Sequence, residues 1–234
     1  MTQPMTPMTQ PMALSDAGTY RLLRRAGFVV AAMWLVAIIV TDAIQQGTTR
    51  NIITNAATAQ HAILTHQAVI VVESMSSFYL AAFLVVFAAA MKRALGDAVH
   101  ASAVFGAAVL AAVTIVLGAA VSFAELTAAH HHNTTALVTL GYLVAFAWTW
   151  EGAMWGFLLL ATGWAILATK AAPRWFAIAS LVLGVPVVLG PGAVLFWALA
   201  PVWFALAGFL LSRRLNVPQD KSAVTPATLT AAGH

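Results

Sequence analysis

Long apolar runs, separated by short polar connections, make up most of the chain. A helical membrane span needs roughly 20 consecutive apolar residues, and six runs reach or approach that length. They cover approximately residues 26–45, 66–91, 100–125, 149–169, 174–190 and 192–212. The pattern therefore predicts an all-α fold, a polytopic membrane helix bundle with about six transmembrane helices.

The two ends of the chain differ from this core. The opening stretch MTQPMTPMTQPM is too polar and too rich in proline to pack, so residues 1–20 are expected to be a disordered tail. Residues 215–234 are expected to be a second tail. The predicted transmembrane domain therefore comprises residues 21–214.

Two local features refine the predicted helices. The apolar stretch that ends at residue 169 begins near 135 and is too long for one span, so an outer segment near 135–147 should be joined to the fourth span or bent from it. The sequence GPG at 190–192 indicates a tight outer turn. Pro186 and Pro201 should kink or distort the last two spans, because proline lacks a backbone N–H.

The composition identifies the class of protein. Hydrophobic residues form 62% of the chain and charged residues 8%, whereas soluble proteins are about half apolar and a quarter charged, so an integral membrane protein is indicated. The absence of cysteine excludes disulfides, thiolate nucleophiles and iron–sulfur or zinc–thiolate sites. Although the net charge is +4, the basic residues do not gather on one soluble face, so no nucleic-acid partner is expected.

The basic residues predict the topology. Arg50 alone falls in a connection on one side of the predicted spans, and the positive-inside rule therefore places both termini in the cytoplasm. The other ten Lys and Arg residues fall on the opposite side: Arg21, Arg24, Arg25, Lys92, Arg93, Lys170, Arg174, Arg213, Arg214 and Lys221.

Four of the seven carboxylates lie in or beside the predicted spans, where a charged group is costly and marks a candidate functional site. They are Asp42, Glu73, Glu125 and Glu151. Three of them stand 17 to 19 residues from the nearest cytoplasmic basic residue, which is about 26 to 29 Å at roughly 1.5 Å per residue. We therefore expect these three at one level near the outer boundary of the hydrocarbon, with Glu125 just beyond it.

Other polar and aromatic residues accompany these acids. His66 shares a helix face with Glu73, seven residues on, and Trp155 lies one turn from Glu151. The pattern predicts an outward-facing acidic cavity that binds a small ligand or a cation. Alternatively, the acids reach headgroup water and the tryptophans form an interfacial aromatic belt. Beyond the four acids, the candidate ligand-binding residues are His66, Ser76, Ser77 and Trp155.

Metal and enzyme chemistry have few candidates. His130, His131 and His132 form a run on the outer side, and neutral imidazoles bind zinc, copper or nickel, although adjacent histidines on a loop can also be merely solvated. There is no HExxH, P-loop or GxSxG motif, and all three lysines lie on the cytoplasmic side. The sequence thus identifies neither catalytic residues nor a cofactor and favours a protein that is not an enzyme.

The segment GWAILATKAAPRWFAIASLVLGV, residues 163–185, has a distinctive order of features. A span ends at a basic residue, a Pro-Arg pair follows at Pro173 and Arg174, and a glycine-containing span begins. This segment resembles the inner loop of a bacterial six-helix integral membrane family, catalogued as domain of unknown function 4386. The resemblance extends over roughly residues 20–214. It implies a six-helix fold and a bacterial plasma (inner) membrane location, and it supplies no function.

Three functional hypotheses follow. The first is binding, transport or sensing of a small ligand or cation through the acidic cavity. The second is a structural or assembly subunit of a membrane complex, in which small-residue helix faces contact a partner protein or a second copy of the chain. The third is an intramembrane lipid-modifying enzyme with acidic catalysts. Membrane lipids surround the spans in all three.

Overall fold

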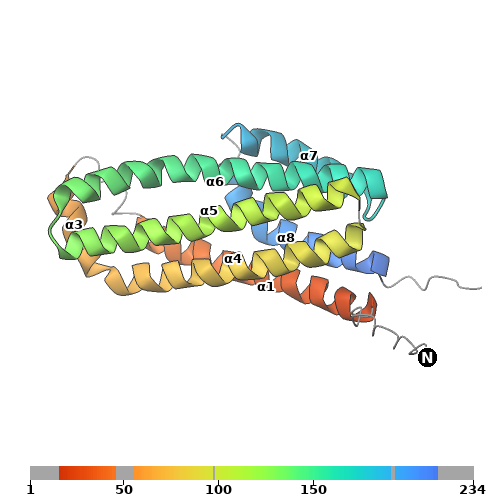
Figure 1. Cartoon of the computed structure of the whole chain (residues 1–234), viewed down its shortest axis with the longest axis horizontal. Coiled ribbons are helices and arrows are strands. Elements are labelled where there is room, and N and C mark those ends of the chain that lie inside the picture. The colour runs from red at the N-terminus through yellow and green to blue at the C-terminus, as the bar shows by residue number, and fades with distance from the viewer. Residues whose placement is uncertain (1–15, 46–54, 97, 191–192, 216–234) are drawn as a thin grey trace, which may run out of the picture.

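Every regular element that the computed structural model describes is a helix (Figure 1), within residues 16–45, 55–96, 98–190 and 193–215. The helices are α1 (Asp16–Gln45), α3 (Ala56–Thr65), α4 (Gln67–Leu95), α5 (Val99–His130), α6 (Thr134–Thr169), α7 (Arg174–Val188) and α8 (Ala193–Leu215). The all-α prediction is confirmed for this part of the chain. The predicted tails lie largely outside the described residues, but residues 16–20 begin α1.

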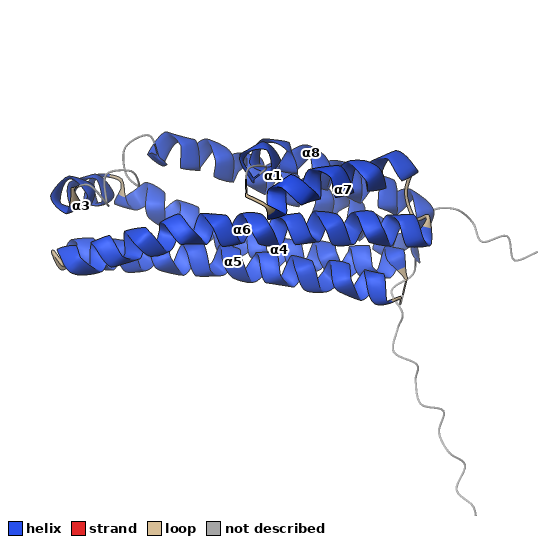
Figure 2. Ribbon diagram, turned by 90° about the horizontal axis from the view of Figure 1, so that it is seen from above, coloured by secondary structure: helices blue, strands red, loops and turns tan. Residues whose placement is uncertain are grey.

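The long helices run side by side and alternate in direction (Figure 1). α4, α5 and α6 pack in sequence, α1 packs on α4, α8 on α1, and α7 on α6, whereas α7 and α8 touch only sparsely. Figure 2 shows α3 at the end of the bundle where α5 and α6 are joined. The opposite end of the bundle differs from this one in its basic side chains.

α5 and α6 are longer than a bilayer requires. With 32 and 36 residues at roughly 1.5 Å each, they extend about 48 and 54 Å, against a hydrocarbon core of ~30 Å. α6 is continuous, so the expected outer segment at 135–147 is joined to the fourth span without a break. α7 has only 15 residues, about 22 Å, and therefore ends well before α6 does.

Four of the described helices are long and apolar enough to cross a membrane. They are Gln67–Leu95, Val99–His130, Trp150–Thr169 and Leu195–Arg213. This finding supports a membrane-embedded helical protein. α1 and α7 are not among the four, so the number six comes from the sequence pattern alone.

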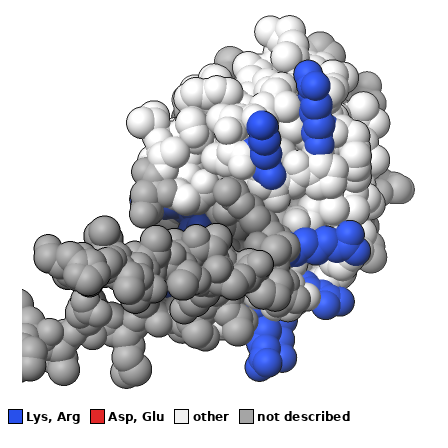
Figure 3. Space-filling view, turned by 90° about the vertical axis from the view of Figure 1, so that its right-hand side faces the viewer, with Lys and Arg blue, Asp and Glu red and all other residues white. Residues whose placement is uncertain are grey.

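Basic side chains gather at one end of the bundle. Viewed end-on, its described surface shows Lys and Arg and no Asp or Glu (Figure 3). We call this the basic end, and the opposite one the outer end. The Lys and Arg residues of the basic end come from the start of α1, the end of α4, the α6–α7 connection and the end of α8: Arg21, Arg24, Arg25, Lys92, Arg93, Lys170, Arg174 and Arg213.

The helix α3, which the hydrophobic pattern did not predict, covers the outer end. It begins after Asn55, whose side chain accepts a hydrogen bond from a first-turn N–H and caps the helix. The Gln60 amide donates to the Ala129 carbonyl at 2.8 Å. α3 also shares a small apolar cluster with the tips of α5 and α6: Ala59, Ile63, Ala128, Ala129 and Leu137.

Glycines allow neighbouring helices to touch. A Cβ on Gly27 of α1 would lie 2.9 Å from the Phe204 carbonyl oxygen and 3.0 Å from the Gly208 Cα, both in α8. α7 approaches α6 equally closely at Gly163, where an added Cβ would lie 2.7 Å from the Ala177 carbonyl oxygen. Because these atoms belong to the backbone, the helices themselves would have to separate to admit a side chain.

Gly27→Ala should therefore destabilise the protein. Overpacking typically costs about 1–3 kcal/mol, which exceeds the roughly 0.5–1 kcal/mol gained when a helical glycine is replaced. The control is Gly118→Ala in α5, where no atom of another described helix lies within 4 Å of an added Cβ, and which should be neutral or stabilising. Thermal unfolding of the purified proteins in detergent compares them, and equal effects would contradict the close α1–α8 contact.

Candidate functional site

Glu151 lies on α6 beside an aromatic cluster in the centre of the bundle. Its carboxylate accepts a hydrogen bond from Trp155 Nε1–H, one turn along, at 3.3 Å. The Trp155 indole is fully buried and packs edge-on against Trp34 of α1, with 4.6 Å between ring centroids. Phe196 and Phe204 of α8 lie against the same indole, each at 5.8 Å between centroids. The half-buried Glu151 is thus held by a side chain that packing has already fixed.

Pro201 in α8 explains why a hydrogen bond joins Trp34 of this cluster to α8. Proline has no N–H, so the Trp197 carbonyl, four residues earlier, loses its helical donor. Trp34 Nε1–H donates to that carbonyl at 3.1 Å and replaces the missing bond, which links α1 to α8. A second buried link joins α8 to α7, where Trp203 Nε1–H donates to Ser180 Oγ at 3.0 Å.

Glu151 stands where the bundle narrows. Gly156 of α6 packs against Val188, the last residue of α7. Glu151 is five residues farther toward the outer end, or about 7 Å, so α7 has ended before this level. It also lies 19 residues from Lys170, roughly 28 Å along α6, which is close to the hydrocarbon thickness of ~30 Å.

The described acids do not share one level, contrary to the prediction. Trp164 of α6 packs edge-on against His100 of α5, at 5.2 Å between centroids. Glu151 is 13 residues from Trp164, whereas Glu125 is 25 residues from His100. Glu125 therefore stands roughly 18 Å nearer the outer end. The expectation was wrong because α6 extends past the start of α5, so Lys170 and His100 do not mark the same level.

Glu73 of α4 accompanies Glu125. α4 touches α5 on both sides of Glu73, and these two contacts place Glu73 at about the level of the α5 turn that contains Glu125. Both acids therefore lie in the outer part of the bundle. The contacts that set this register are Gln67 with His130 at 3.2 Å and Phe78 with Phe123 at 6.5 Å between ring centroids.

Two buried oxygens in this outer part have no hydrogen-bond partner among the described residues. They are Oε1 of Glu125 and Oγ of Ser74. Leaving a buried polar group unpaired costs roughly 1–3 kcal/mol, so such groups are uncommon in folded proteins. Their presence on adjacent helices shows that polar groups are buried where α4 packs against α5.

The structure describes the side chains of three of the remaining predicted ligand residues, Ser76, Ser77 and His66. The hydroxyls of Ser76 and Ser77 donate to carbonyls four residues earlier in α4, at 2.8 and 3.0 Å, and are thus used within their own helix. His66 is exposed at the junction between α3 and α4. The backbone of Asp42 belongs to α1, but its side chain lies outside the described part of the structure.

The histidine run lies at the outer end. His130, His131 and His132 are exposed, and the first and last contact Gln67 and Gln60, respectively. Among the residues described, no three His, Asp or Glu side chains are grouped so as to hold a metal ion. The metal site stays a prediction, to which this geometry adds nothing.

The sequence did not reveal that Trp34, Trp197 and Pro201 form one contact. The sequence does indicate that each partner is needed. A proline inside an apolar helix frees the carbonyl four residues earlier, and a buried tryptophan needs an acceptor. The pairing of donor and acceptor spans 163 residues of chain and requires the helix arrangement.

Comparisons with known proteins assign no family. No protein-family model, curated protein or solved structure matches the chain. The resemblance of residues 163–185 to domain of unknown function 4386 therefore stays a prediction. The site has to be interpreted from its own geometry.

Trp34→Phe tests the link between α1 and α8. This substitution keeps a ring in the cluster but removes the donor to the Trp197 carbonyl, so the free energy of unfolding should fall by about 1–3 kcal/mol. With Pro201→Ala, α8 supplies its own N–H, and the same substitution should cost about 1 kcal/mol less. Thermal unfolding of all four proteins measures the coupling, and strict additivity would contradict it. Trp150→Phe, at a side chain that is 62% exposed, is the control.

Proposed function

We propose that the protein spans the plasma (inner) membrane six times, with both termini on the cytoplasmic side. Four apolar helices and the gathering of Lys and Arg at one end support this topology. α1 and the short α7 supply the two remaining spans. The basic end faces the cytoplasm, and the α3 cap lies on the outer side.

Within this topology, the proposed function is binding of a small cation at Glu151, in the service of transport or sensing. One observation carries the proposal: the Glu151 carboxylate is held against buried indoles at the level where the bundle narrows. The carboxylate supplies the negative charge that attracts a cation, and the Trp155 N–H holds that carboxylate in place. A charged residue is expensive within a span and is a functional-site candidate by default.

The outer acids support the direction of access. Glu73 and Glu125 lie between Glu151 and the outer end, where the carboxylates attract cations from the outer solution. The basic end, with its Lys and Arg residues, repels them. Cations are therefore expected to reach Glu151 from the outer side.

A second candidate is a structural or assembly subunit. Gly106 and Gly118 of α5 have no atom within 4 Å of an added Cβ, so these small residues do not serve helix contacts within the described chain. Small residues on an open helix face permit close approach of a helix from another protein or from a second copy. Co-purification of a stoichiometric partner would favour this candidate.

Cation binding at Glu151 should change the emission of the neighbouring Trp155. We expect sodium, magnesium or tetramethylammonium chloride, each against a potassium chloride background of equal ionic strength, to shift tryptophan fluorescence and raise the unfolding temperature of the purified protein. Glu151→Gln should abolish the response, because the carboxylate charge is lost, and Glu73→Gln should weaken it.

The control for this titration is Asp220→Asn, which removes one carboxylate from the C-terminal segment and should respond like the wild type. Gel filtration shows whether each variant is folded. Wild-type responses in both glutamate variants would sink the cation proposal and leave the subunit candidate standing.

The topology is testable because the chain has no cysteine of its own. Pro173→Cys, in the α6–α7 connection, should react with a membrane-impermeant maleimide only after the membrane is opened. Thr135→Cys, at the start of α6, should react in intact cells. Both residues are exposed, so accessibility itself is matched. The reverse labelling pattern would overturn the orientation.

A further inference from the structure

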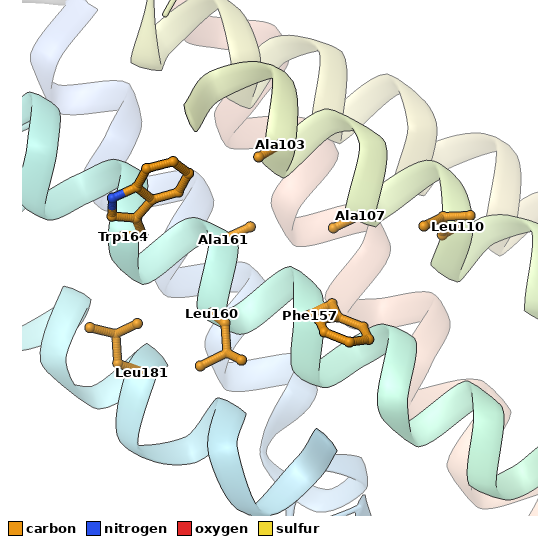
Figure 4. A pocket seen from close by; sticks show the side chains of 8 residues that line it. All are labelled: Ala103, Ala107, Leu110, Phe157, Leu160, Ala161, Trp164 and Leu181. Carbon is orange, nitrogen blue, oxygen red and sulfur yellow. The ribbon is translucent and has the colours of Figure 1, made fainter. Parts of the chain in front are cut away.

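An apolar groove runs along the outside of the bundle between α5, α6 and α7 (Figure 4). Its volume is about 500 Å³, within the roughly 300–1,000 Å³ of small-molecule sites. The hollow arises on α5, where alanines stand opposite large side chains of the neighbouring helices. Its main lining residues are Ala103, Ala107, Leu110, Phe157, Trp164 and Leu181.

The groove occupies one half of the bundle, toward the basic end. On α6 its lining runs from Trp164 to Phe157, which are 6 and 13 residues from Lys170. These positions correspond to roughly 9 and 20 Å along the helix, whereas the whole hydrocarbon core is ~30 Å thick. The groove therefore begins in the leaflet adjoining the basic end and reaches slightly past the middle of the hydrocarbon core.

The lining determines what the groove accepts. Its side chains are hydrocarbon apart from the Trp164 indole, so a polar ligand would lose hydrogen bonds on entry and an acyl chain would lose none. His100 lies on the same α5 face as Ala103 and packs edge-on against Trp164 at 5.2 Å between centroids. The two rings thus mark the end of the groove nearest the headgroups, where amphipathic aromatic residues are favoured.

Two basic residues lie at the helix ends beside this end of the groove. Lys170 closes α6 and Arg174 opens α7, six and seven residues from the lining residues Trp164 and Leu181, and both side chains are exposed. The N-terminus of α7 adds the positive end of its helix dipole. Figure 3 shows no Asp or Glu on the visible described surface here. The charge therefore complements an anionic headgroup.

We propose that this groove is a binding site for an anionic phospholipid of the cytoplasmic leaflet. One acyl chain lies between α5 and α6 against Phe157 and Trp164, and the headgroup phosphate faces Lys170 and Arg174. The site is separate from Glu151, which lies on the same helix at the outer side of the groove. Its occupancy depends on the orientation proposed above and not on cation binding.

Native mass spectrometry of the detergent-purified protein tests the site, with phosphatidylglycerol and phosphatidylcholine of identical acyl chains as probes. The wild type should bind the first more tightly. Lys170→Gln/Arg174→Gln should lower that affinity roughly ten- to thirtyfold, because each basic residue near an anionic headgroup contributes about a fivefold effect. Ala103→Leu should lower the affinity for both lipids, because it fills the groove.

Matched controls separate this site from general effects. Arg21→Gln/Arg25→Gln removes two charges from the same end, and Ala120→Leu enlarges an exposed alanine of the same helix, so both should bind like the wild type. Equal affinity of the wild type for the two lipids, or an equal loss in both double variants, would overturn the proposal.

If Ala103→Leu does not fold, a second measurement tests whether an acyl chain lies beside Trp164. Phosphatidylglycerol with brominated acyl chains should quench the wild-type tryptophan emission by more than that of Trp164→Phe. Equal quenching would refute acyl-chain binding beside Trp164. A dimer in the mass spectrum that Ala103→Leu dissociates would instead assign the groove to a second copy of the chain and overturn the lipid site.

Discussion

The hydrogen bond from Trp34 to the Trp197 carbonyl joins α1 to α8, the first and last helices of the described chain. Pro201 creates the need for it, and Gly27 and Gly208 bring α1 and α8 close enough for it to form. The same Trp34 ring supports the Trp155 indole, which in turn holds the Glu151 carboxylate. The acid is therefore positioned by contacts that begin at a missing backbone N–H in another helix.

The hydrophobic pattern predicted most helices but not their relative heights. The run at 66–91 became Gln67–Leu95, and the run at 100–125 became Val99–His130. Counting residues measures distance along one helix axis and says nothing of the offset between neighbours, so Glu151 and Glu125 were wrongly placed near one level. α3 escaped prediction because its ten residues mix polar and apolar positions without a long run.

Glu151 and the apolar groove share α6 but lie in different surroundings. The half-buried Glu151 is held by an indole inside the helix cluster, whereas Phe157 and Trp164 are about half exposed and line an outer face. Charge follows the same division, because the described carboxylates lie toward the outer end and the basic residues lie at the other. The proposed cation and lipid sites therefore lie on differently charged parts of the same helix.

The unbroken course of α6 has a mechanical consequence. Its 36 residues contain no proline, and they connect the surface under α3 to the contact with α7 at Gly163. A helix without a proline kink has no sharp hinge at which its two halves could tilt independently. A displacement of the α3 cap is therefore expected to move the far end of α6 as well, together with α7, which packs closely against Gly163.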